Sequence, residues 1–159
     1  MRVMKEFELY FSYAQFLMFD VAVTEPALEW SELHSAQGFV RGESMAAIGT
    51  LLSHGIARAR VFDATPQDVG SYRRVIAVPM ELTSDRVAFT NPDALPDEAV
   101  AVEVPRGHYR VVVAQKLEDD GQCEAVDIFF ERLTEPLSAS EIIVADDALH
   151  PPTPLLERS

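Results

Sequence analysis

Residues 109–131, YRVVVAQKLEDDGQCEAVDIFFE, decide the fold. The apolar residues that alternate along this stretch are Tyr109, Val111 and Val113, and then Val126, Ile128 and Phe130. Alternation at period two is typical of β-strands with one face buried. The two runs are separated by Glu-Asp-Asp-Gly at 118–121, a strong turn signal. The stretch therefore predicts an antiparallel hairpin.

The residues just before this stretch extend the pattern. Val100, Val102 and Val104 alternate, and the turn at Pro105–Gly107 leads directly to Tyr109. Because a short turn between two alternating runs is the usual sign of a hairpin, we expect 100–104 to pair with 109–113.

Further strands are predicted on both sides of these hairpins. Alternating or apolar runs occur at residues 7–13, 15–21, 56–62, 72–82, 86–89 and 141–145, with weaker candidates inside 39–52. Pro79 cannot donate to a ladder, so it predicts an edge position or a bulge within its strand. Residues 24–35 break the pattern and fit a loop or one short helical turn. Roughly eight to ten strands without a long helix predict an all-β fold, an antiparallel β-sandwich with at most short helical turns.

The length of 159 residues suits one domain. We expect residues 1–146 to form the β-sandwich. Residues 147–159 contain Pro151, Pro152 and Pro154 and are expected to form an extended proline-rich tail.

The chain carries 26 acidic and 13 basic residues, a net charge of −13. Residues 91–159 alone contain 15 acidic and 5 basic residues. Proteins that bind the nucleic-acid backbone use Lys and Arg to neutralise phosphates, so we expect no direct binding to nucleic acid. The charge favours a basic protein as partner.

Residue types that carry chemistry are sparse. Cys123 is the single cysteine, and His34, His54, His108 and His150 lack the close spacing of metal ligands. No nucleophile, base and orienting acid can be assembled from spacing. We therefore expect no catalytic residue, no metal and no cofactor. The start of the chain is not a basic segment followed by an apolar run, and no apolar stretch is long enough for a membrane span, so we expect a cytoplasmic protein.

Glu118, Asp119, Asp120 and Glu124 are candidate contacts for a basic partner, because a surface of carboxylates can mimic DNA phosphates in the basic groove of a nuclease. Trp30, flanked by Glu29 and Glu32, is a candidate interface anchor. The alternative for Trp30 is a structural plug that covers one end of the sandwich.

Four pieces of the sequence resemble, in order, pieces of one known family. They are Ser12–Phe16, Trp30 followed by Gly38 and Phe39, Ser71 and Tyr72 leading into Val78 and Pro79, and Val104–Tyr109. They look like the Ser-Tyr-x-Gln-Phe core, the Trp with a later Gly-Tyr, the Ser-Tyr run into a Val-Pro strand, and the Leu-Pro-x-Gly-x-Tyr turn of the competence protein J family. The resemblance runs from about residue 8 to 116 and finds no counterpart beyond about 117.

This resemblance implies a cytoplasmic inhibitor that forms a complex with the DNA-entry nuclease of competent cells, without catalytic activity or cofactor. It assigns no inhibitory residue, because the matching residues are equally well explained by β-architecture. Two other functions remain open from the residues: a binding module for a carbohydrate or other small molecule, with Trp30 or Tyr13 stacking on it, and, least favoured, a hydrolase using paired acids. Exposed strand edges allow a homo-oligomer without requiring one.

Overall fold

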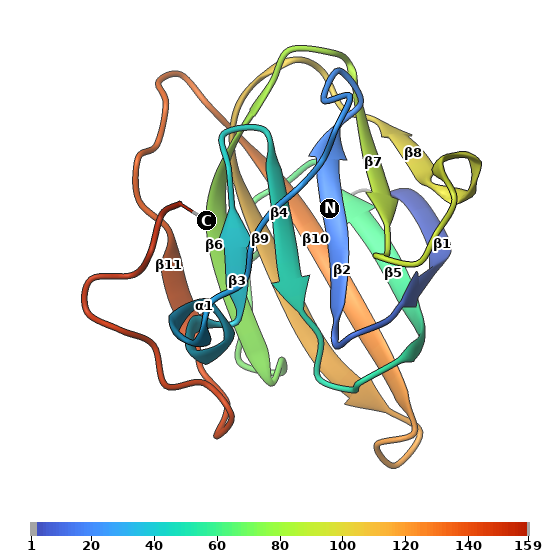
Figure 1. The fold of residues 1–159 in the computed structure, drawn as a ribbon, viewed down its shortest axis with the longest axis vertical. Helices are drawn as coiled ribbons and strands as arrows, with labels where there is room; N and C mark the ends of the chain where they lie inside the picture. Colours follow the sequence, from blue (N-terminus) through green and yellow to red (C-terminus); the bar gives the residue numbers. More distant parts are fainter. Residues whose placement is uncertain (1–2, 159) are drawn as a thin grey trace.

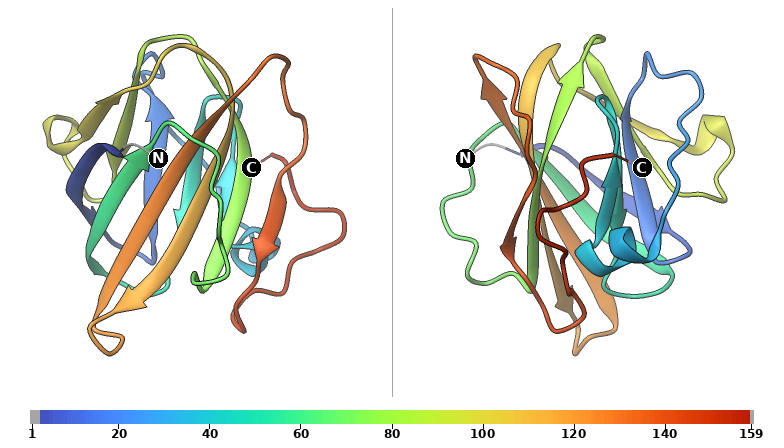
Figure 2. Two further views of the ribbon diagram at one scale, coloured as in Figure 1. Left: turned by 180° about the vertical axis from the view of Figure 1, so that it is seen from behind. Right: turned by 60° about the vertical axis from the view of Figure 1, so that its left-hand side comes forward.

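Two β-sheets packed face to face make up residues 3–158, the part of the chain that the computed structural model describes (Figures 1 and 2). Sheet A has the strand order β1 (Val3–Phe11), β5 (Gly55–Phe62), β10 (Cys123–Leu133), β9 (Gly107–Glu118), β6 (Arg74–Leu82) and β11 (Glu141–Val144). Sheet B has the order β3 (Phe39–Arg41), β4 (Met45–Gly49), β2 (Gln15–Asp20), β7 (Arg86–Thr90) and β8 (Val100–Glu103). The predicted all-β sandwich is confirmed. The helical segments are short: α1 (Glu32–Gln37) and the 3-10 turn η1 (Pro96–Glu98).

Most strand pairs are antiparallel, as expected, but β5 and β10 run parallel. The reason is the path of the chain, which changes sheet between successive strands at several places. Strand β1 lies in sheet A and β2 in sheet B, and the turn between them holds Tyr13 and Ala14 at φ 53° and 55°. Strands that become neighbours after such crossings are not joined by a hairpin, so their direction is not fixed by a turn.

The predicted hairpin at 109–131 is confirmed as β9 and β10. Every one of the 11 residues of β10 pairs with a residue of β9, from Cys123 opposite Glu118 to Leu133 opposite His108. At the turn, Asp119, Asp120 and Gly121 have φ values of 53°, 56° and 86°. Glycine adopts this left-handed conformation without a Cβ clash, and Asp is among the residues that tolerate it best.

The predicted hairpin between 100–104 and 109–113 is wrong. Strand β8 pairs with β7 in sheet B, whereas β9 pairs with β10 and β6 in sheet A. The intervening residues cross between the sheets and are held by Asp85: the Val104 N–H donates to its carbonyl at 3.1 Å and the Arg106 N–H to its Oδ1 at 2.9 Å. Both alternating runs face the same core from opposite sides, so their sequence pattern is that of a hairpin.

Pro79 lies in β6, which is flanked by β9 and β11, yet the expectation of an edge position holds locally. Strand β11 pairs with β6 only at Val75, Ile76 and Ala77 and ends before Pro79. The Glu81 N–H, two residues further, bonds to the carbonyl of Glu43 rather than to β9. Because alternate N–H groups of a strand point the same way, the Pro79 nitrogen also faces away from β9 and no ladder bond is lost.

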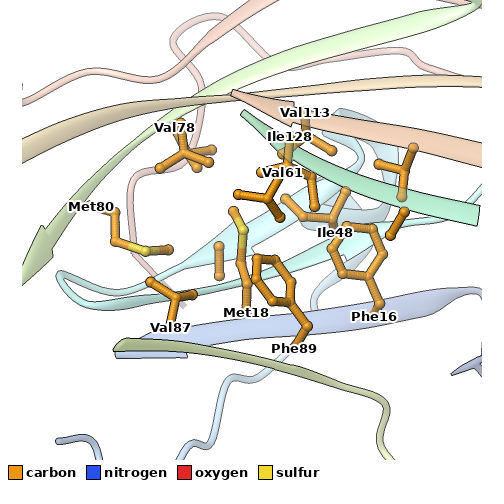
Figure 3. Packing of buried hydrophobic residues seen from close by; sticks show 14 of the residues in the cluster. Phe16, Met18, Ile48, Val61, Val78, Met80, Val87, Phe89, Val113 and Ile128 are labelled. Carbon is orange, nitrogen blue, oxygen red and sulfur yellow. The ribbon is translucent and has the colours of Figure 1, made fainter. Parts of the chain in front are cut away.

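The core lies between the sheets. Figure 3 shows Phe16, Met18 and Phe89 of sheet B packed toward Val61, Val113 and Ile128 of sheet A. The other face of sheet A is covered as well, by the segment after β5. Its apolar cluster consists of Phe62, Val75, Ala77, Val112, Ala114 and Phe129. This double burial explains why residues 111–114 are continuously apolar, since both faces of β9 need apolar side chains.

The C-terminal segment, expected as an extended proline-rich tail, packs against α1 and β3. Leu149 is 6 % exposed and belongs to the core. The Leu156 N–H donates to Gln37 Oε1 at 2.8 Å, and Gln37 Nε2 donates to the carbonyl of Leu156 at 3.0 Å. Arg41 binds Glu157 at 2.9 Å. The division of the chain at residue 146 stays a prediction.

Asp20, at the end of β2, is a buried carboxylate that fixes the turn between β6 and β7. It accepts hydrogen bonds from the Ala22 N–H at 3.1 Å, from the N–H and hydroxyl of Thr83 at 2.6 and 2.9 Å, and from Ser84. Burial by itself raises the pKa of Asp20, but these hydrogen bonds outweigh it and lower the pKa from 3.8 to about 2. The folded chain therefore holds Asp20 ionised.

We predict that the free energy of unfolding falls as the pH is lowered from about 4 to about 2. Because the pKa of Asp20 is lower in the folded chain, its contribution is present above its unfolded value of 3.8 and is lost as the pH approaches about 2. A pKa difference of this size corresponds to about 2 kcal/mol. Urea unfolding at several pH values measures it, and Asp20→Ala should flatten this part of the profile; an unchanged profile in that variant would contradict the assignment.

Candidate partner-binding surfaces

The three acids predicted at the hairpin turn lie together at the exposed tip of β9 and β10, at one end of the sandwich (Figure 1). Glu118 accepts hydrogen bonds from Arg58 Nη2 on both oxygens at 3.0 Å. Asp119 and Asp120 are exposed. Asp120 lines a shallow surface depression together with Lys116 and Arg73. The charge of the tip is therefore mixed rather than purely negative.

Glu124 does not belong to this surface, and its predicted role as a contact for a partner is wrong. Its side chain is 2 % exposed. Oε1 accepts hydrogen bonds from the backbone N–H groups of Leu51 and Leu52 at 3.0 and 2.9 Å, and Oε2 accepts one from Gln115 at 3.4 Å. Burial raises the pKa of Glu124, although the bonds from Leu52, Leu51 and Gln115 act in the opposite direction. Glu124 holds the loop after β4 onto sheet A.

The neighbourhood of Glu124 continues as a polar network across the end of the sandwich. Gln115 donates to the carbonyl of Gly49 at 2.8 Å, and Arg74 donates to the same carbonyl at 3.2 Å. Arg74 also binds both oxygens of Asp146 at 3.1 and 3.0 Å. Strands of both sheets and the segment after β11 are thus joined through buried side chains.

Trp30 lies apart from the acidic tip, in the segment before α1. It is half-buried, and its indole Nε1 donates to Gln15 Oε1 at 2.9 Å. It lines a cavity of about 370 Å³ with Tyr13 and Arg74. Tyr13 is 74 % exposed. The structure therefore joins Trp30 to Tyr13 and not to Glu118, Asp119 and Asp120.

A groove that the sequence did not indicate runs along β1, beside the loop between β7 and β8. It has a volume of about 620 Å³. Its wall contains Glu8 and Tyr10 of β1, Ile56 of β5, and Asp93 and Glu98 of the loop. These residues lie far apart in the chain, so the sequence alone does not show that they meet. The one local indication is the alternation along β1, which places Glu8 and Tyr10 on the opposite face from Leu9.

In the described residues the potential metal ligands do not cluster, and the thiol of Cys123 is exposed. In residues 3–158 no group of three or more His, Cys, Asp or Glu side chains could hold a metal ion. Cys123 is exposed beside the tip, where a hydrogen bond with Asp119, slight desolvation, and the charges of Asp119 and Glu118 raise the pKa of its thiol. The thiolate, which is the nucleophile, is disfavoured there. Over the same residues, every helix is too short or too polar to cross a membrane.

Comparison with known proteins identifies the family. The family model described as Competence protein J matches residues 8–131, which include strands of both sheets. The chain belongs to the competence protein J family. The match continues past residue 117, beyond the part of the sequence that carries the resemblance, and covers most of β10. No protein with a curated description matches the chain.

Two solved structures have a similar fold. The crystal structure of ComJ from Bacillus subtilis, an inhibitor of the DNA-degrading activity of NucA, has a TM-score of 0.69 at 18 % identity and covers 83 % of this chain and 98 % of that chain. A structure described as crocagin biosynthetic gene J has a TM-score of 0.55 at 19 % identity and covers 82 % of this chain and 98 % of that one. The competence protein J fold therefore extends over almost the full length of both.

We predict that Glu124→Ala lowers the free energy of unfolding by about 3 kcal/mol, because the N–H groups of Leu51 and Leu52 are left without their acceptor in a buried site. Glu118→Ala, which breaks an ion pair more than a third exposed on both sides, should cost less than about 1 kcal/mol. Urea unfolding of both variants measures the difference. Equal losses would show that Glu124 is no more structural than Glu118.

Proposed function

We propose that this chain binds a partner nuclease and inhibits its DNA-degrading activity. The observation that carries the proposal is the family match over residues 8–131. The fold it shares with Bacillus subtilis ComJ, an inhibitor of NucA, supports it further. An inhibitor that acts by occupying a surface performs no chemistry. The proposal is therefore a cytoplasmic protein without catalytic activity and without a cofactor.

The charge of the molecule supports a basic partner. A nuclease must attract the DNA backbone, and a protein with a net charge of −13 is drawn to the same positive surface. Much of the chain's positive charge is neutralised internally, since six arginines form ion pairs with its own carboxylates. They are Arg41, Arg58, Arg60, Arg74, Arg106 and Arg110. Asp119 and Asp120 at the tip, with Glu118, remain proposed contacts, as does Trp30.

The test is a titration of the purified chain into the NucA-type nuclease of the same organism, with degradation of double-stranded DNA as the readout. We predict loss of degradation at an equimolar ratio. Raising the salt from about 0.05 to about 0.5 M should weaken inhibition by about tenfold, because salt screens attraction between opposite charges. Complete digestion in the presence of excess chain, and no complex in gel filtration at low salt, would refute the proposal.

A second candidate function rests on the cavity shared by Trp30 and Tyr13. Its volume of about 370 Å³ suits a small ligand, and two aromatic side chains offer stacking surfaces for a sugar. This reading makes the chain a small-molecule binding module without a nuclease partner.

We predict for this candidate that millimolar sugars raise the thermal midpoint of the wild-type chain by about 2–4 °C and that of Trp30→Ala by less, because a ligand that binds only the folded state stabilises it. Differential scanning fluorimetry with a panel of monosaccharides and disaccharides measures the shift. Trp30→Phe, which keeps an aromatic ring, is the matched control. Identical midpoints with and without every sugar would count against a carbohydrate site.

A further inference from the structure

Strand β1 is an edge strand whose second side borders a groove. In sheet A it pairs with β5 alone among the described strands. Its other side faces the loop between β7 and β8, and the two segments lie next to each other in both Figure 1 and Figure 2. The groove is closed at two points: Lys5 Nζ donates to the carbonyl of Ala101 at 3.1 Å, and Ser12 Oγ donates to Asn91 Oδ1 at 3.3 Å. Residues Glu8–Phe11 lie between these closures.

The floor of the groove is apolar and its margin exposes large side chains. Leu9, Phe11 and Phe89 form the floor and belong to the core. At the margin, Tyr10 is 57 % exposed and lies opposite Ile56 on β5, which is 46 % exposed. Large apolar side chains gathered at one hollow are typical of interaction sites, and tyrosine is prominent among the residues that carry binding energy.

The charged residues that line the groove are acidic, and one histidine, His54, lies beside them. Glu8, Asp93 and Glu98 line it, and its described lining contains neither Lys nor Arg. The neighbouring groove beyond Lys5 is mixed, because Lys5 and Arg86 line it together with Asp85. The hairpin tip is mixed as well. The groove beside β1 is therefore the surface hollow best suited to a positively charged segment.

We propose that a basic, extended segment of the nuclease docks in this groove, alongside the unpaired edge of β1. The proposal rests on the proposed function, which supplies a basic protein partner. An extended segment beside an edge strand can add main-chain hydrogen bonds to the sheet while alternate side chains enter the hollow. Lysine or arginine side chains of that segment meet Glu8 and Asp93, and an apolar side chain covers Phe11.

A second copy of this chain fits the groove poorly. Pairing two β1 edges would bring the carboxylates of Glu6 and Glu8 from both copies together, and like charges facing each other across strands are destabilising. Charges on an edge strand also deter pairing with unwanted strands. The same charges select a partner of opposite sign.

The experiment compares three double variants that each remove two negative charges. The groove pair is Glu8→Gln with Asp93→Asn, the tip pair is Asp119→Asn with Asp120→Asn, and the control pair is Glu135→Gln with Asp147→Asn. All six positions are exposed, so each variant should fold. Inhibition constants against the NucA-type nuclease are measured at low salt. We expect the groove pair to weaken inhibition by about tenfold, the tip pair by about threefold and the control pair by less than about twofold.

A further variant tests the apolar margin without changing charge. Tyr10→Ala should weaken inhibition by about tenfold, whereas Leu33→Ala, which removes a similarly exposed large apolar side chain of α1 outside the groove, should have little effect. If the groove pair and Tyr10→Ala inhibit the nuclease as well as the wild-type chain does, the groove is not the docking site, although the proposed function stands. Weakening confined to the tip pair would overturn the groove in favour of the tip. If the wild-type chain itself inhibits no nuclease, the proposed function fails first.

Discussion

The register between β9 and β10 is the constraint on which the rest of the structure depends. It turns Val113 and Ile128 toward the space between the sheets, and Val112 and Phe129 toward the cluster on the other face of sheet A. A slip of one residue would exchange the two faces of a strand. Because β5 and β6 pair with this hairpin on either side, their own positions follow from it.

Buried carboxylates mark the places where loops are tied to this framework. Asp20 binds the turn after β6, and Glu124 binds the loop after β4. Asp127 on β10 accepts two hydrogen bonds from Arg60 at 2.8 Å and one from Tyr72 at 2.5 Å, which ties the segment after β5 to sheet A. A buried ion that keeps its partners is tolerated, whereas the same ion without them is strongly destabilising. Part of the chain's acidity therefore serves its architecture rather than a partner.

Local sequence patterns predicted the strands well, whereas contacts between distant parts of the chain could not be predicted from them. The β9 and β10 hairpin could be predicted because a turn signal and two alternating runs are contiguous. The step from Val104 to Tyr109 could not, since a crossing between sheets and a hairpin turn bury the same alternate residues. Glu124 was assigned to a surface because it follows the exposed tip, yet period two turns it inward beside Gln115. The groove depends on β1 meeting residues 91–98, and a sequence pattern does not show which distant segments meet.

The contacts of the C-terminal segment have a consequence for how the molecule is made. The imidazole of His34 binds the carbonyl of Arg158 at 2.6 Å, across 124 residues of chain, and Gln37 binds Leu156 across 119. Contacts at such separation slow folding, because the entropy of closing the loop is lost before the contact forms. On a ribosome, α1 and β3 are synthesised well over a hundred residues before the partners that they bind at residues 156–158. The nascent chain therefore carries these surfaces uncovered until residues 156–158 have been synthesised and have left the ribosome.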